Sequence, residues 1–305
     1  MQPLAYPYSL ARQPPARPAL IVAHPGHELR VYGWLEAALP CVCVLTDGSG
    51  RTERSRLAST TRVLEATGAT PGALYGEMSD AEFYKAVLAF DHSRFTRIVD
   101  ALASMFLRER IDFVVGDAEE GYNPAHDVCR LVVNAAVRMA SRAAGTPVAN
   151  YDFTLVAPPS RCPEALRPDA VWLKLDGETL SRKLAAARNY PELRAEVEAA
   201  LSGAGSVGLR EHPDIATRRE SDFGGAGADD FSIECLRPVD ARRGCVPLFS
   251  GRPFYEEYGE RQVALGHYSR VLRYRDHILP LAAALDSHVE QGTTHRGSVP
   301  TCGRP

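Results

Sequence analysis

The sequence predicts an α/β fold in which a mostly parallel, Rossmann-like sheet carries helices on both faces. Short apolar runs alternate with segments of helical periodicity along the first half of the chain. These runs do not alternate apolar and polar residues, which is typical of strands buried on both faces of a parallel sheet. After about residue 150 the alternation becomes irregular, and we expect a C-terminal α/β elaboration there.

Three buried apolar runs predict three strands of this sheet. They cover residues 19–24 (ALIVAH), 41–46 (CVCVLT) and 111–117 (IDFVVGD). Loops that bind ligands lie at the carboxyl ends of the strands in such a sheet. We therefore expect His24 and Asp117, which end two of these runs, to lie at one edge.

Helical spacing of apolar residues predicts the segments that connect the strands. Gly68 is the expected left-handed end of one helix, and Ser93 is a candidate cap at the start of the next. The predicted helices cover 27–39, 56–69, 93–110 and 125–143.

The second half of the chain is less regular. We expect one or two strands followed by helices in 166–203, a glycine-rich mobile loop in 202–230, and a helix over 258–285. The tail from Glu290 is poor in apolar residues and is predicted to be disordered.

Composition excludes several classes of protein. The 305 residues carry a net charge of −3 with scattered lysine and arginine, which argues against a nucleic-acid or membrane-surface partner. No apolar run approaches the ~20 residues of a membrane span, and the N-terminus lacks the layout of a signal peptide. The seven cysteines form no CxxC pair and are interpreted as reduced core residues. We expect a cytoplasmic enzyme with a small-molecule substrate, and a homo-oligomer is compatible with the sequence.

Histidines at the ends of two predicted strands carry the functional argument. The first run continues into HPGHE, which places His24 and His27 three residues apart, and GYNPAHD places His126 after the third run. Zinc commonly takes three protein ligands in catalytic sites, with imidazole nitrogen among the preferred donors. The sequence therefore predicts a zinc site built from three histidines. The duller alternative is that each is a hydrogen-bonded structural residue, and His27 could instead face solvent at a helix start.

These segments resemble a known family. LIVAHPGHE, LTDGSG and GYNPAHD are similar, in order and spacing, to motifs of the LmbE/PIG-L superfamily of zinc-dependent de-N-acetylases, with AHPGHE in place of AHPDDE. The resemblance covers about residues 17–150. It implies a metal-binding domain over 17–160. From composition and pattern we further expect a C-terminal elaboration over 161–288, a flexible start at 1–16 and a disordered tail at 289–305.

The resemblance assigns roles to the residues of the first motif. His24 matches the first metal histidine and His126 the last, while His27 stands at the position of the metal-binding aspartate and can donate a neutral nitrogen. This change makes the metal site about one unit more positive. Gly26 stands at the position of the catalytic base and cannot take a proton. Glu28 matches the closing glutamate, which supports the site from behind the ligands.

Other candidates handle protons or the oxyanion. Asn123 stands where many members have a histidine that steadies the oxyanion, and its amide can still donate a hydrogen bond. Asp117, Glu119 and Glu120 lie on the loop that leads to His126, and we expect one functional carboxylate among them, with Asp117 best placed and Glu120 the alternative.

Two residues are candidates for substrate binding. Arg56 lies near the place of a substrate-binding arginine, although a solvated helix face explains it equally well. Tyr122, beside the metal segment, either contacts substrate or packs.

Three functions remain open at this point. The first is a zinc-dependent hydrolase of an N-acyl bond on a sugar or small metabolite, with the zinc-bound water as nucleophile. The second is a non-hydrolytic metalloenzyme of specialised metabolism, for example one catalysing cyclisation or acyl transfer. The third is a non-catalytic zinc- or ligand-binding protein.

Overall fold

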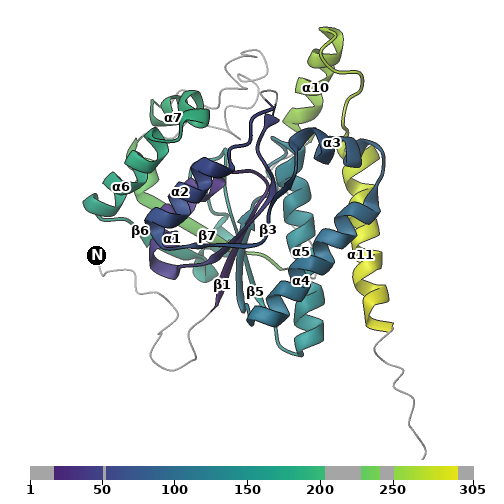
Figure 1. Cartoon of the computed structure of the whole chain (residues 1–305), viewed down its shortest axis with the longest axis horizontal. Helices are drawn as coiled ribbons and strands as arrows, with labels where there is room; N and C mark the ends of the chain where they lie inside the picture. Colours follow the sequence, from purple (N-terminus) through teal and green to yellow (C-terminus); the bar gives the residue numbers. More distant parts are fainter. Residues whose placement is uncertain (1–16, 51–52, 203–227, 241–250, 295–305) are drawn as a thin grey trace, which may run out of the picture.

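A seven-stranded sheet in the order β3-β2-β1-β4-β5-β7-β6 forms the centre of the molecule (Figure 1). The computed structural model describes residues 17–50, 53–202, 228–240 and 251–294. Strands β1 to β5 pair in parallel, whereas β7 pairs antiparallel with both β5 and β6. The strands are β1 Pro18–Val22, β2 Cys41–Thr46, β3 Thr70–Met78, β4 Phe113–Asp117, β5 Ala149–Phe153, β6 Val171–Lys174 and β7 Ile233–Pro238. The predicted fold class, a mostly parallel sheet in an α/β protein, is confirmed.

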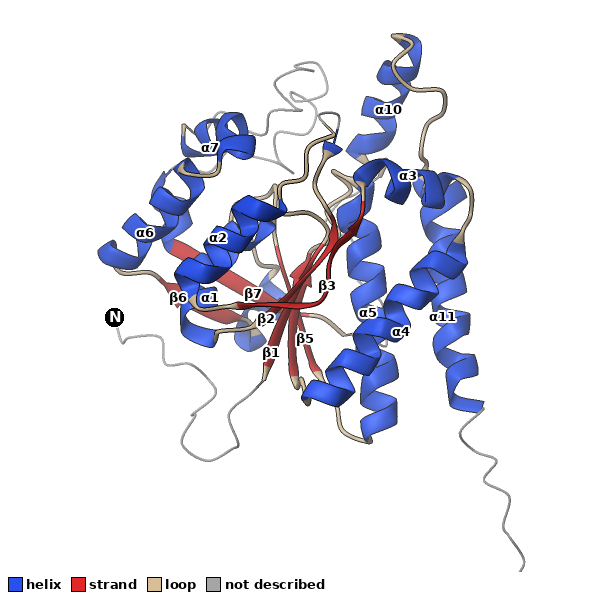
Figure 2. Ribbon diagram, viewed as in Figure 1, coloured by secondary structure: helices blue, strands red, loops and turns tan. Residues whose placement is uncertain are grey.

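Helices cover both faces of the sheet (Figure 2). Each layer buries its own apolar core against the sheet. One core joins the sheet to α3, α4, α5 and α11, and the other joins it to α1, α2 and the end of α6. The helices are α1 Tyr32–Ala38, α2 Leu57–Thr67, α3 Asp80–Leu88, α4 His92–Glu109, α5 Pro124–Ala144, α6 Gly177–Arg188, α7 Arg194–Leu201, α10 Phe254–Ala264 and α11 Leu279–Thr294. Short 3₁₀ helices cover His27–Val31 (η1), Glu164–Asp169, Pro191–Leu193 and Ala228–Ser232, and a π-helical turn covers Tyr274–Ile278.

The order of the strands places two carboxyl ends side by side. β1 lies between β2 and β4, and Ile21 is in register with Gly116. The pairing is close, because a Cβ on Gly116 would lie 2.8 Å from the Ile21 carbonyl oxygen. Residues that follow β1 therefore meet residues that follow β4, at the edge where such sheets bind ligands.

The structure adds elements that the sequence did not predict. Strands β5 and β7 are two of them, and no element was predicted between residues 70 and 92, where the chain forms β3 and α3. β3 is an edge strand interrupted by register shifts, and Gly72 and Gly76 break its apolar pattern.

Several predicted boundaries were wrong. The helix predicted from residue 27 begins with the 3₁₀ turn η1 before α1. Ser93 is not a cap, since α4 begins one residue earlier and the Ser93 hydroxyl donates to Asp91. The helix predicted over 258–285 is broken after Ala264 by a turn at Gly266, a residue with positive φ.

The predicted tail also begins too early. α11 continues to Thr294 and buries Val289 against the first core. The flexible start at 1–16, most of the loop at 202–230 and the end of the tail lie outside the described residues. None of the described helices is long and apolar enough to span a bilayer.

Candidate metal centre

Three imidazole rings meet at the carboxyl edge of the sheet. His24 follows β1, His27 begins η1, and His126 lies in the first turn of α5. The ring centres are 5.3 Å apart for His24 and His27, 5.5 Å for His24 and His126, and 4.6 Å for His27 and His126. We call these three residues the histidine cluster.

Thr46 and Asp80 hold the ring of His24. Its Nδ1 lies 2.8 Å from the Thr46 hydroxyl oxygen and 3.1 Å from Oδ1 of Asp80. The Thr46 hydroxyl donates to the Ala23 carbonyl, so its oxygen accepts from Nδ1–H of His24. Hydrogen-bond geometry favours Thr46, and Asp80 therefore acts mainly through its charge. This arrangement leaves Nε2 of His24 as its basic nitrogen.

Asp80 is a buried carboxylate at the start of α3. Burial alone would raise its pKa, but the neighbouring His24 ring and Thr46 hydroxyl, together with the backbone N–H of Gly50 that donates to Oδ2, hold the pKa well below its usual range. Asp80 therefore stays negative beside His24.

Asp117 holds the ring of His27. Its Oδ2 lies 3.0 Å from Nδ1 of His27 and also accepts from the backbone N–H of Ala23. Because Asp117 is fully buried and engaged in this way, the geometry does not support the proton-transfer role predicted for it. It supports a positioning role, in which a carboxylate orients a histidine for another partner.

His126 is the unpaired member of the cluster. Its Nδ1 is buried and has no hydrogen-bond partner among the described residues. Burial, and then the nearby rings of His27 and His24, lower the pKa of His126 well below its ordinary value. The ring is therefore neutral, as a metal-binding imidazole must be.

The donor set fits a zinc ion in its chemistry and its spacing. Tetrahedral zinc with Zn–N bonds of about 2 Å would place the centres of its imidazole rings about 5 Å apart, close to the distances in the cluster. A buried polar atom without a hydrogen-bond partner, such as Nδ1 of His126, also indicates a place where an ion or water can bind. In the described part of the chain, no group of three or more histidine, cysteine or carboxylate side chains is already arranged to hold an ion.

The backbone between His24 and His27 turns sharply at Gly26. Gly26 has φ +104°, a conformation that side chains rarely adopt. Its N–H donates to Oε2 of Glu28 at 2.7 Å. Glu28 is fully buried, and its burial raises its pKa to about 7. Glu28 thus supports the turn that carries the two histidines.

The N-cap of α5 positions Asn123. Its side-chain oxygen accepts from the N–H of Ala125 at 2.8 Å and from the hydroxyl of Tyr84 at 2.9 Å. Both bonds use the oxygen, so the amide nitrogen is the donor that Asn123 can offer to a ligand. The neighbouring Tyr122 stacks on Phe254, with ring centres 4.9 Å apart.

The two glutamates of this loop serve other partners. Glu120 accepts hydrogen bonds from the backbone N–H groups of Leu155, Val156 and Ala157, so it anchors a loop and the geometry does not support its predicted proton-transfer role. Glu119 accepts from the Tyr274 hydroxyl.

Arg56 lies near the edge that carries the cluster. It precedes α2, and its guanidinium and the Asp80 carboxylate both lie within 4 Å of the position of a Cβ on Gly50. Substrate binding by Arg56 and Tyr122 remains a prediction.

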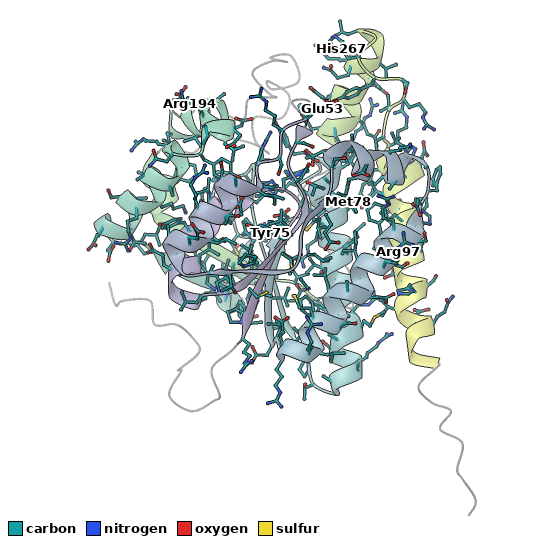
Figure 3. All side chains as sticks on the ribbon, in the orientation of Figure 1. Glu53, Tyr75, Met78, Arg97, Arg194 and His267 are labelled. Carbon is teal, nitrogen blue, oxygen red and sulfur yellow. The ribbon has the colours of Figure 1, made fainter. Side chains whose placement is uncertain are left out.

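The sequence prediction missed Thr46 and Asp80. Thr46 ends a predicted strand, so its place at the edge could have been inferred. Asp80 lies in the unassigned segment, where the pattern Ser79-Asp-Ala-Glu82 marks a helix start. His267 lies at the outer tip beyond α10 and bonds to Gln262, apart from the cluster (Figure 3).

Fold and site together define an α/β protein with a histidine cluster at the carboxyl edge of its sheet. No family model and no curated protein matches the chain. The solved structures that resemble it include the zinc-inhibited form of teicoplanin deacetylase Orf2, at 15% identity and TM-score 0.38, covering 74% of this chain and 98% of that one. A triple mutant of the deacetylase Orf2 of the teicoplanin pathway is 17% identical with a TM-score of 0.42, and the match covers 74% of this chain and 98% of that one. The A40926 pseudoaglycone deacetylase Dbv21 is 18% identical with a TM-score of 0.38, and the match covers 78% of this chain and 100% of that one. At these scores the likeness bears on neither activity nor substrate, and the fold assignment rests on the sheet itself.

Proposed function

We propose that this protein is a zinc-dependent hydrolase of an N-acyl bond on a sugar or small metabolite. The observation that carries the proposal is the histidine cluster, in which Asp80 and Asp117 orient two rings and the third has an unpaired buried nitrogen. His24, His27 and His126 would hold the ion. The similarity of AHPGHE to the motif of zinc-dependent de-N-acetylases supports the same reading.

A zinc ion at this place would polarise the amide carbonyl and lower the pKa of water. The residues of the chain then have separate tasks. Asp80 and Asp117 lie beside Nδ1 of His24 and His27, so that the Nε2 atoms of both rings face the ion. The Asn123 amide donates a hydrogen bond to the carbonyl oxygen of the substrate as negative charge develops there. Hydrolysis breaks the C–N bond, adds hydroxyl to the acyl carbon and transfers a proton to the leaving nitrogen.

The absence of a base at residue 26 sets the expected rate. A general base or acid typically contributes a factor of about 10² to 10⁴. Gly26 contributes none, so we expect turnover slower by about that factor than in a site with a carboxylate there.

A panel of N-acetylated sugars and amines, assayed with and without chelator, tests the proposal. Acetate release that chelator abolishes and zinc restores is the expected result. His24→Ala should abolish it, whereas the matched control His267→Ala should leave it unchanged. Bound zinc without turnover of any amide would refute hydrolysis and favour a non-hydrolytic or binding role.

A further inference from the structure

We propose that the turn Tyr190–Leu193 forms an apolar wall of the histidine cluster and that Leu193 determines which acyl chains the site accepts. The proposal rests on the proposed amide hydrolysis, because it assigns a role to one side of the substrate. Its starting point is the space beside Gly26, between His24 and His27.

Leu193 occupies the space that a side chain at residue 26 would need. A Cβ on Gly26 would lie 2.2 Å from Cδ1 of Leu193 and 3.6 Å from Cζ of Tyr190. Residue 26 stands between two members of the cluster, so the Cδ1 methyl group of Leu193 lies against the backbone that carries both rings. Leu193 itself is only partly buried. An apolar side chain therefore stands where the related motif carries a carboxylate.

Hydrogen bonds fix this turn to α2. The Tyr190 hydroxyl lies 2.9 Å from the Thr60 hydroxyl and donates to the Arg56 carbonyl at 3.3 Å. Ser59 donates to the Glu192 carboxylate at 2.7 Å. Tyr190 is buried, and its ring belongs to the core beneath α1 and α2. The turn is thus a built part of the molecule, and Leu193 is held in place.

The chemistry of the wall indicates which part of a substrate faces it. Leucine methyl groups neither donate nor accept protons, so Leu193 binds rather than catalyses. Apolar walls bind the apolar part of a ligand, while the few polar groups orient the rest. In an N-acyl sugar or amine the apolar part is the acyl chain. Leu193 therefore limits the length of that chain.

The first test measures the contact between residues 26 and 193 and needs no activity. Gly26→Ala should lower Tm by at least about 4 °C, because the new Cβ is strained and collides with Leu193. In the Leu193→Ala background the same change should lower Tm clearly less, since the collision with Leu193 is gone and only the backbone strain remains. An equal cost in both backgrounds would overturn the contact.

The second test measures chain selectivity with alkyl hydroxamates, which bind zinc through a common head group. For zinc-loaded protein, Leu193→Ala should raise the affinity for octanohydroxamate relative to acetohydroxamate about tenfold, the gain from burying about two more methylene groups. Leu175→Ala is the matched control, because Leu175 fills the space beside Gly33 in α1 at the same 2.2 Å. It should leave the ratio unchanged.

The outcomes separate this proposal from the proposed function. An unchanged ratio in Leu193→Ala, or no binding of any hydroxamate to the zinc-loaded wild type, overturns the wall. Hydroxamate binding with the expected shift, but without hydrolysis of any N-acyl substrate, supports the wall and refutes hydrolysis.

Discussion

The three histidines differ in what holds their rings. Nδ1 of His27 bonds to the buried Asp117 carboxylate, and Nδ1 of His24 bonds to Thr46 with the Asp80 carboxylate 3.1 Å away, whereas Nδ1 of His126 has no partner among the described residues. Such carboxylates raise the basicity of a metal-binding histidine and fix its tautomer. Asp80 and Asp117 would therefore act on a metal in the proposed site without touching it.

Asp80→Asn and Asp117→Asn should each weaken zinc binding. Loss of an orienting carboxylate typically costs a factor of about 10 to 100 in metal affinity. Competition with a chromogenic chelator measures the effect, with Asp100→Asn on α4 as a control whose affinity stays at the wild-type value. Wild-type affinity in both variants would show that the carboxylates serve the fold alone.

Glu119 should make stability depend on pH. Burial raises its pKa to about 7, against the hydrogen bond from Tyr274 and the charge of Arg130, while Asp152 adds to the rise. The folded protein thus keeps a proton that the unfolded chain loses above its ordinary pKa of 4.5. The free energy of unfolding should fall as pH rises from about 4.5 to about 7.

Glu119→Gln removes this titration. Urea unfolding at about pH 5 and about pH 7.5 should show a smaller fall in the variant than in the wild type. Equal falls would mean that Glu119 is ionised throughout in the folded protein.

Sequence reasoning located the histidines but not their partners. His24 and His27 were predicted as a site because an apolar strand ends just before them. His126 was predicted because the loop that leads to it follows another apolar strand. The roles predicted for Asp117 and Glu120 lack support because a loop position does not reveal which atoms a carboxylate bonds to. Only the folded chain shows Asp117 on His27 and Glu120 on backbone amides.

Among the helices and strands, α3 is the one that the sequence prediction missed and the site requires. It delivers Asp80 to His24 directly after its N-cap Ser79. Edge strand β3, which leads to it, carries Pro71, Gly72 and Gly76 and lacks a clear period. A weak strand signal concealed the helix start that follows it.

Ser79→Ala tests this helix start. Ser79 and Glu82 form a reciprocal capping box, and loss of such a cap costs about 0.5–2 kcal/mol. We expect a loss of free energy of unfolding in that range, together with weaker zinc binding because Asp80 is the next residue. Ser287→Ala, at an exposed position of α11, is the control. An unchanged zinc affinity despite the loss of stability would show that the Ser79 cap does not affect the metal site.

For the whole molecule, the C-terminal elaboration extends the same sheet. β7 pairs with β5 and carries Glu234 to the helices α1 and α6. There the Glu234 carboxylate accepts hydrogen bonds from the backbone N–H groups of Gly33 and Trp34. It also accepts from the buried ammonium of Lys183, whose Nζ lies 2.7 Å away. The parallel half was predictable from its apolar runs. This long-range joint was not, because nothing local pairs β7 with α1 and α6.

Lys183→Ala tests the joint. Burial lowers the pKa of Lys183 and Glu234 opposes that effect, so removing one partner strands a buried charge. Such a loss typically costs about 3–5 kcal/mol of unfolding free energy. The double variant Lys183→Met/Glu234→Gln should lose less unfolding free energy than Lys183→Ala. A single variant within about 1 kcal/mol of wild type would contradict the role of the pair.

We propose that three histidines, one after β1, one in η1 and one in α5, hold one metal ion. The zinc content of dialysed wild type and of His24→Ala, His27→Ala and His126→Ala, with His267→Ala as control, tests this directly. We predict about one zinc per chain in the wild type and the control, and a large loss in each cluster variant. Undiminished zinc in any cluster variant, or none in the wild type, would show that the three histidines do not hold a zinc ion together.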